Sequence, residues 1–539
     1  TFTNSGTIDM TAGGTLKLSL ESPDIGGTGT FTSGTGTVEY DRGNLSFPSG
    51  NQTIDEVTYN NLTINGTDDT DVKTASGTTL DVNGNLTITN GKLDMNTNTV
   101  TLGLEGDFSM AAAGAFDAGT STTHTVGGSW ADIVGSTFTP NTGKFTFEAA
   151  AGNTTITTLA SFYDLSISTG GNSVSAAADL TVNNDFTMTA GNTGNFSAAA
   201  AITVNNDFTM TAGNTGNFST GTNTVEVTGA TNINGGILEI ADSPGIFDAK
   251  DFDANGAFVT FTGNGTLKLG GNAGSTPDLG TFDATTNNGT VEYDLDGNQG
   301  VFNATYHHLE IDNSTGTATA ASALGVEGNL TITNGNLTLD NIALTLGGNF
   351  VLTSGTFVPG NGDHTVTGNW TETLGGVTTF EATAGKFTFN GAPSTITTDA
   401  AGGNKFFNLT SAGNPVTAGY NLDIDGDFTI TGGPFVPGNF NHTVAGNWDD
   451  SGGIFNAGAG TGKITFDGGT STNIKSGLTN DFHHFEINTT ADKTVITNNL
   501  DIDGDFTIIR GTFNPGAFSH DIAGNWDDSG GSFTGGTGT

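Results

Sequence analysis

One tripeptide pattern, a glycine and a small polar residue followed by a large apolar residue, returns at a fixed spacing along the chain. In the second half the apolar residues of the pattern are Leu330, Phe350 and Trp370. In the first half they are Leu86, Phe108 and Trp130, and the step between them is slightly longer. A fixed period of about 20 residues is typical of repeat proteins, in which each unit stacks on its neighbours.

The residues that follow the tripeptide alternate between apolar side chains and threonine, as in Leu330-Thr331-Ile332-Thr333. This period of two indicates a β-strand with one buried face, which a single strand cannot bury alone. If each unit of about 19–22 residues is one coil, the next coil lays its strand parallel to the first at about 4.8 Å. The pattern therefore predicts an all-β parallel β-helix, or β-solenoid. In it, two columns of stacked residues run along the axis: Leu330, Phe350 and Trp370 inside, and Asn329, Asn349 and Asn369 bonded to one another through their amides.

Antiparallel hairpins are the alternative interpretation of the same strands. Asn83-Gly84 and Asn90-Gly91 are dipeptides that favour tight hairpin turns. Hairpins do not, however, require the same residue types to return at one fixed spacing. The repeat therefore favours the parallel solenoid.

The repeats predict one continuous solenoid over residues 1–539 rather than several globular domains. At about 19.5 residues per coil the chain would hold about 28 coils and form a rod of about 130 Å. The 84 glycines, with abundant threonine and asparagine, favour short strands and turns over helices.

Longer repeats are superimposed on the coil period. Residues 1–250 and 251–490 resemble each other, since Thr37–Asp41 recurs as Thr290–Asp294. Residues 181–197 recur without change at 203–219, which indicates that one coil has been duplicated. Over 343–539 a longer period relates Trp370, Trp448 and Trp526, and we interpret each such unit as four coils. Neither end shows a polar capping coil, so we expect a segment of a longer array, or a subunit that associates end to end.

The charge balance restricts the partners. Thirteen basic residues stand against 55 acidic ones, for a net charge of −42. A surface of this charge repels phosphates, so the composition argues against nucleic acid as a partner and against insertion into a membrane. The chain has no cysteine, which excludes disulfides and cysteine metal sites and is compatible with export.

The eight histidines fall in two repeat motifs. His124, His364, His442 and His520 begin strands that lead to a tryptophan, and the pairs His307-His308 and His483-His484 take the place of Asn60-Asn61. A metal site needs its ligands to converge, whereas copies four coils apart would lie about 19 Å apart along the axis. We therefore predict structural or surface histidines and no metal site.

Two kinds of acidic motif were considered as sites. Asp423–Asp427 and Asp501–Asp505 resemble the start of a calcium loop, but Pro434 stands where an EF-hand needs glutamate, so only weak calcium binding at the surface is left open. The pairs Asp449-Asp450 and Asp527-Asp528 could serve glycoside hydrolysis, but their repeat spacing favours polar turns. The two arginines, Arg42 and Arg510, are far apart in the sequence. We predict no catalytic, cofactor-binding or metal residues, and no cofactor.

Phrases such as Gly-Asn-Leu-Thr-Ile-Thr-Asn-Gly (residues 328–335) and Phe482–Ile487 resemble the repeats of very large bacterial cell-surface proteins of the adhesin type. That resemblance implies an exported chain, extracellular or on the cell surface, folded as a right-handed parallel β-helix. It supplies no functional residues.

The function expected from these observations is structural. We expect a rigid acidic β-solenoid in a surface fibre, filament, sheath or adhesin stalk, with no enzymatic activity and with cell-surface glycans or other cells as further partners. The alternative is a carbohydrate-binding or polysaccharide-cleaving β-helix, which would expose aromatic residues on adjacent coils. The column of Trp130, Trp370, Trp448 and Trp526 with apolar residues predicts that these tryptophans are buried instead.

Overall fold

The computed structural model describes most of the chain: residues 2–43, 50–150, 152–283, 287–375, 378–380, 382–391, 393–413, 415–458, 460–478 and 480–538. The fold is an all-β solenoid of about 24 turns over residues 2–533, with ~21 residues per turn. In the described residues the only helix is a 3-10 turn at Ala400–Gly402, and no helix is long and apolar enough to cross a membrane. The predicted fold class is confirmed.

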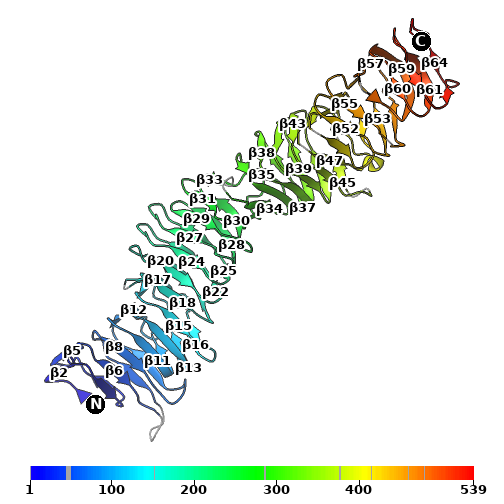
Figure 1. Cartoon of the computed structure of the whole chain (residues 1–539). Helices are drawn as coiled ribbons and strands as arrows, with labels where there is room; N and C mark the ends of the chain where they lie inside the picture. The colour runs from blue at the N-terminus through cyan, green and yellow to red at the C-terminus, as the bar shows by residue number, and fades with distance from the viewer. Residues whose placement is uncertain are drawn as a thin grey trace. The chain divides into compact units, whose positions relative to one another are not determined.

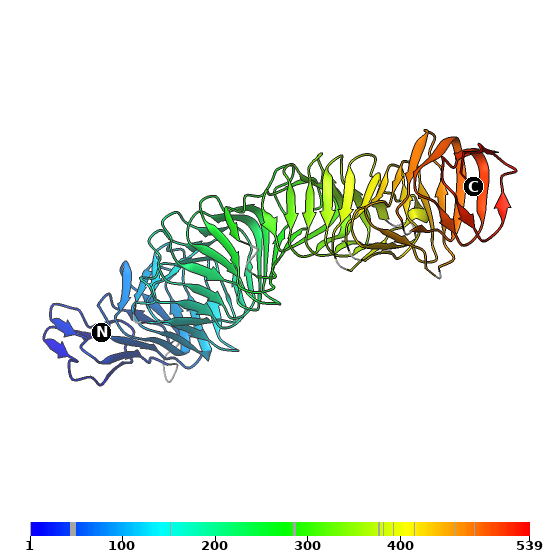
Figure 2. The same ribbon diagram turned by 45° about the horizontal axis from the view of Figure 1, so that its top comes forward.

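Contacts divide the chain into two compact units, which are described separately. The first comprises residues 1–268 and 278–289, and the second comprises residues 269–277 and 290–539. Within each unit, the strands of successive turns lie side by side (Figures 1 and 2). The single domain over residues 1–539 stays a prediction.

In the first unit each turn contributes three strands. The successive strands β12 (Thr101–Leu104) and β13 (Phe108–Asp117) pair with strands of the next turn: β14 (His124–Val126), β15 (Trp130–Asp132) and β16 (Thr137–Thr139). Both halves of β13 are used, because β15 pairs with its start and β16 with its end. All three pairings are parallel, so the turn has three sides, each covered by the next turn.

The second unit repeats this arrangement. Its early turns run through β38 (Leu324–Val326), β39 (Leu330–Leu339), β40 (Leu344–Leu346), β41 (Phe350–Leu352), β42 (Gly355–Val358), β43 (Asp363–Val366) and β44 (Trp370–Glu372). The start of β39 pairs with β41 and its end with β42, again in parallel. The alternative of hairpins is wrong, because every strand pairing described is parallel, and Asn90-Gly91 lies within β11 (Leu86–Asp94).

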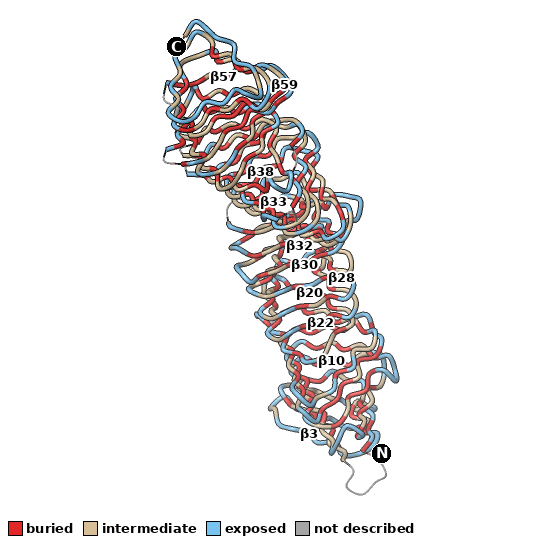
Figure 3. The backbone as a smooth tube through the Cα atoms, turned by 90° about the vertical axis from the view of Figure 1, so that its right-hand side faces the viewer, coloured by how far each residue is buried: buried red, intermediate tan, exposed pale blue. Residues whose placement is uncertain are grey.

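The core is built from columns of aligned side chains. Leu330 pairs with Phe350, and Phe350 with Trp370, and all three are fully buried. Figure 3 shows buried residues alternating with more exposed ones along the chain, as the period of two requires. The predicted interior column is confirmed.

The asparagine column lies at a corner of the solenoid, where Asn329 and Asn349 are half-buried and Asn369 is exposed. The Oδ1 of Asn329 accepts from the backbone N–H of Asn349 at 3.0 Å, and the Oδ1 of Asn349 accepts from the N–H of Asn369 at 2.9 Å. A direct bond between amides joins Asn349 Nδ2 to Asn329 Oδ1 at 3.2 Å. Within this column, the bond that recurs from turn to turn therefore runs from a backbone N–H to an amide oxygen, rather than from amide to amide as predicted.

Glycine precedes each asparagine because the corner has no room for a side chain. A Cβ on Gly368 would stand 2.3 Å from the carbonyl oxygen of Gly348, and one on Gly348 would stand 2.4 Å from that of Gly328. Contacts this short do not occur between real Cβ atoms and oxygens. Stacking at this spacing therefore explains the constant first residue of the tripeptide.

The duplicated segment pairs with its own copy. Leu180–Val182 aligns with Ile202–Val204, and Phe186–Met188 aligns with Phe208–Met210. The rings of Phe186 and Phe208 stack with centroids 5.2 Å apart and planes 3° apart. The duplicated unit is thus one complete turn.

The long repeat over 343–539 is not four turns. The column that contains Trp370 continues through Ile396 and Ala418, and Val416 then pairs with Phe435 of β52 (Pro434–Val436). Two further strands, β53 (Asn441–Val444) and β54 (Trp448–Asp449), follow before Trp448 is reached. Three turns and two strands separate Trp370 from Trp448. Since a turn has three sides, this is one side short of four turns, and the tryptophan of each copy lies on a different side from that of the copy before.

Pairing on the neighbouring side shows the same displacement. His364 pairs with Phe387, and the column continues through Leu409 and Phe428 to Trp448. The tryptophan of one copy therefore stacks in the column that holds the histidine of the copy before it. Because turns such as that from Trp370 to Ile396 are longer than the predicted coil, the chain makes about 24 turns and not the predicted 28.

Candidate functional site

Histidines are the most regularly placed polar side chains of the core. The Nδ1 atoms of four of them accept backbone N–H groups of the preceding turn at 2.9–3.2 Å: Leu102 to His124, Leu344 to His364, Leu422 to His442 and Leu500 to His520. The first three rings are fully buried. These four residues, which we call the strand histidines, hold adjacent turns together, as the structural interpretation predicted.

Burial disfavours a charged imidazole inside the core. It lowers the pKa of His124, His364 and His442 to about 4 from the ordinary 6.5, and it also lowers the pKa of His520. At neutral pH the rings carry no charge, and an uncharged Nδ1 can accept a hydrogen bond.

The paired histidines occupy a corner position. The Nδ1 of His308 accepts from the N–H of Asn329 at 2.9 Å, and that of His484 accepts from the N–H of Asp505 at 3.0 Å. At the equivalent place, Asn61 Oδ1 accepts from the N–H of Asn85 at 2.9 Å. Histidine and asparagine exchange here because each offers one acceptor at the same reach. Among the described residues no three histidine, aspartate or glutamate side chains converge on a point where a metal ion could bind.

The two segments that resemble calcium loops follow the strand and corner pattern. Asp423 lies in β50 (Asp423–Ile424), and its carboxylate accepts from Thr443 Oγ1. Asp427 takes the corner position and accepts from the N–H of Asn447 at 2.7 Å, while Asp425 forms an ion pair with Lys405 at 2.7 Å. Asp505 likewise accepts from the N–H of Asn525 at 2.9 Å. These carboxylates point to separate partners, and surface calcium binding stays a prediction.

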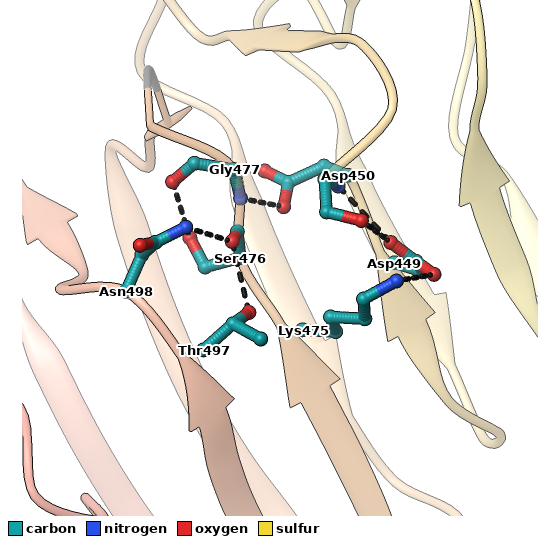
Figure 4. Close-up of polar contacts among 8 residues, drawn as sticks. Asp449, Asp450, Lys475, Ser476, Gly477, Thr497 and Asn498 are labelled. Atoms are coloured by element: carbon teal, nitrogen blue, oxygen red, sulfur yellow. Dashed lines mark hydrogen bonds and ion pairs between the residues drawn. The ribbon is translucent and has the colours of Figure 1, made fainter.

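Asp449 and Asp450 are adjacent residues that face opposite sides of the backbone (Figure 4). Asp449 faces outward, where it pairs with Lys475 at 3.0 Å and accepts from the N–H of Ser451. Asp450 is fully buried and accepts from the N–H of Gly477 at 2.6 Å. Burial raises the pKa of Asp450 to about 6, whereas hydrogen bonds and Lys475 outweigh burial and lower that of Asp449. Two carboxylates on opposite sides of one strand cannot flank a glycosidic bond.

The acidic pair belongs to a wider motif, tryptophan followed two residues later by a buried carboxylate. The residues are Asp132, Glu372 and Asp450, and none is more than 3% exposed. Glu372 accepts four bonds, from Trp370 Nε1 at 2.6 Å, Asn404 Nδ2 at 2.8 Å, Thr398 Oγ1 at 2.9 Å and the N–H of Asp399 at 3.0 Å. Burial raises the pKa of both Asp132 and Glu372.

Equivalent bonds recur in the first unit, where Asp132 accepts from the N–H of Leu159 at 2.8 Å and from Thr158 Oγ1 at 3.0 Å. The tryptophan before each carboxylate pairs with an isoleucine of the next turn, and that turn is longer than most. Each carboxylate thus binds the chain just after that isoleucine. The sequence indicates Asp450 only as half of an acidic pair, and Asp132 and Glu372 are not among the predicted sites, although the constant spacing of all three after tryptophan is visible in the sequence. In the fourth copy, Asp527 and Asp528 are exposed.

Two buried lysines are also absent from the sequence analysis. Lys73 is fully buried, and its Nζ donates to the carbonyl oxygens of Gly50 at 2.6 Å and Arg42 at 2.7 Å. Burial lowers the pKa of Lys73 to about 8. Lys493 is equally buried and donates to the carbonyl of Ala445 at 3.2 Å. Lys73 thus binds main-chain oxygens of the preceding turn, and Lys493 reaches a carbonyl two turns away, so both charges link turns of the solenoid.

The arginines form separate local contacts. Arg42 Nη1 lies 3.2 Å from a carboxylate oxygen of Glu21, and Arg510 Nε donates to Asn488 at 2.8 Å. Trp130, Trp370 and Trp448 are buried as predicted, but Trp526 is 44% exposed. Trp526 stacks on Phe506 on one side, with ring centroids 4.5 Å apart, and no described strand continues its column beyond it.

Comparisons of the chain with protein-family models, with curated proteins and with solved structures found no match. The functional argument therefore rests on the residues of this chain.

Proposed function

We propose that this chain is a structural, non-catalytic segment of an extracellular fibre, filament, sheath or adhesin stalk. One observation supports the proposal most strongly: the side chains that could carry chemistry are bonded between turns. The strand histidines, the corner asparagines, the buried carboxylates and Lys73 bind backbone groups of a neighbouring turn. A chain that uses its reactive groups in this way is built for stiffness.

The charge supports an extended role in water. A net charge of −42 makes copies repel one another sideways, which keeps a long repeat protein soluble. At an end of the stack, parallel strands present unpaired backbone groups, which another turn of the same kind can bind strand by strand. We therefore place further turns of the same chain, or another copy joined end to end, as its main partners.

Localisation tests this proposal. Antibodies raised against the purified chain should label intact source cells at their surface in immunoelectron microscopy, on threads or a coat outside the envelope. A control antibody against a cytoplasmic protein should label only permeabilised cells. Labelling of this chain confined to permeabilised cells would contradict the proposal.

Carbohydrate binding is the second candidate, and one observation favours it. The half-buried rings of Tyr420 and Phe440 lie on adjacent turns with centroids 5.8 Å apart. Their apolar faces could hold a sugar ring, although most tryptophans are buried. Binding of an oligosaccharide to the chain that is lost in Tyr420→Ala and in Phe440→Ala would favour this candidate. Binding that both variants leave unchanged would count against it.

A further inference from the structure

The histidines are acceptors in the hydrogen-bond network that links the turns. All four strand histidines accept a backbone N–H at Nδ1, and His442 and His520 donate from Nε2 to the carbonyls of Pro437 and Pro515, each at 2.9 Å. One ring nitrogen must therefore lack a proton and the other must carry one. Only the neutral imidazole with its proton on Nε2 satisfies both bonds.

Protonation would turn Nδ1 into a hydrogen-bond donor that faces the backbone N–H, which is also a donor. The backbone N–H of the preceding turn would lose its acceptor, and a charge would be placed between packed rings. His124 stacks on Phe145 at 4.6 Å between centroids, and His364 lies on Phe387 at 4.5 Å. Neither aromatic ring offers an acceptor that could replace the lost bond.

Charged groups around the strand histidines lie on the outer side of the strands. On the strands paired with them, the titratable residues are Lys144, Lys386, Asp423, Lys463 and Asp501, and on their own strands they are Asp363 and Asp521. Each of these residues is next in sequence to a strand histidine or to the residue that pairs with one. Because successive side chains of a strand point to opposite faces, its side chain points away from the ring. Lys386 and Asp363 form an ion pair with each other at 3.5 Å, outside the core.

We infer that the strand histidines form an acid-sensitive latch, which fastens the turn that contains each of them to the preceding turn at neutral pH and releases it when the ring is protonated. The turns that contain a strand histidine then open in mild acid before the other turns do. The inference is independent of the proposed function, because it rests only on the bonds of His124, His364, His442 and His520. The latch makes the contacts between particular turns depend on pH.

Hydrogen exchange at single amides tests the latch. The N–H groups of Leu102, Leu344, Leu422 and Leu500 should lose protection by about tenfold or more between pH 7 and pH 5, after correction for the intrinsic rate. Amides of turns without a strand histidine, such as those of Ile202–Val204, should keep their protection. Equal protection at both pH values for the four leucine amides would overturn the inference.

The chain itself suggests the matched variant. Since Asn61 and His308 serve as equivalent acceptors, His442→Asn should keep an acceptor that does not titrate, and the Leu422 amide should then lose its dependence on pH. His307→Asn is the control, because the Nδ1 of His307 accepts no hydrogen bond. If His442→Asn fails to fold, an NMR titration of the histidine rings in the native protein tests the latch instead. Titration of the buried rings well below pH 6.5 would support the latch, and titration near pH 6.5 would overturn it.

Discussion

Alanine in place of Trp370 is expected to lower the free energy of unfolding by about 3–5 kcal/mol. The indole is fully buried and stacks on Phe350 with centroids 3.8 Å apart, and it also packs against Phe380 at 4.8 Å. Its removal leaves a cavity inside the column and takes away the N–H that Glu372 accepts at 2.6 Å. A buried carboxylate that loses a donor adds to the loss from packing.

Urea-induced unfolding of the whole protein, followed by circular dichroism, measures this loss. Thr371→Ala is the matched control, because Thr371 lies on the same strand with its side chain exposed. We expect the midpoint to fall clearly for Trp370→Ala and to remain nearly unchanged for Thr371→Ala. Equal effects of the two substitutions would contradict the interior column.

Asparagine in place of Asp450 is expected to raise the free energy of unfolding by about 3 kcal/mol at pH 7 and above. Burial raises the pKa of this carboxyl from 3.8 to about 6. Such a group supports the fold fully below pH 3.8, and that contribution is lost as the pH rises through about 6, where the buried carboxyl must ionise. Asparagine avoids the charge and still offers an oxygen to the N–H of Gly477.

A series of urea titrations from pH 4 to pH 8 tests this sign. The increase in the free energy of unfolding of Asp450→Asn over the native protein should be largest at pH 7 and above. It should disappear near pH 4, where the native carboxyl is also neutral. Asp449→Asn serves as the control, since it removes the outer carboxylate that pairs with Lys475 and should be neutral or destabilising at pH 7. A loss of stability at pH 7 in Asp450→Asn would show that the buried charge is itself needed.

The two kinds of buried titratable group act in opposite directions between about pH 4 and pH 6.5. Buried neutral histidines contribute to the free energy of unfolding above pH 6.5, and this contribution is lost as the pH falls toward 4. The contribution of Asp450 increases over the same fall in pH. Burial raises the pKa of Asp132 and Glu372 as well, so these carboxyls act in the same direction as Asp450. The latch is therefore measured at the leucine amides beside the histidines rather than from the stability of the whole chain.

Periodicity in the sequence was sufficient to predict the parallel strands, the approximate length of a turn and the column of Leu330, Phe350 and Trp370. It could do so because identical residue types at one spacing are what stacking requires. The division of the long repeat over 343–539 into four coils is wrong, because a repeat need not end on the side of the solenoid where it began. Only the pairing of Phe428 with Trp448 reveals that the motif moves to a neighbouring side.

The polar contacts could be predicted less well. Histidines were recognised as structural, but the use of Nδ1 as an acceptor depends on the direction of the ring, which a spacing does not contain. Repeat spacing favours a polar turn for Asp449 and Asp450, whereas the alternation that starts at Trp448 places Asp450 inside. Sequence spacing shows which residues share a column, and three-dimensional structure shows what their atoms bind.

Removal of one duplicated turn is the most direct test of the central claim that turns are interchangeable structural units. Deletion of residues 192–213 joins two identical sequences and should bring Phe218 beside Val174, in the place that Phe196 now holds. We expect a folded protein with unchanged β-structure per residue by circular dichroism. Deletion of residues 192–202 alone, about half a turn, should destroy the register and cause aggregation. An unfolded product from the full-turn deletion, or a folded one from the half-turn deletion, would contradict the account.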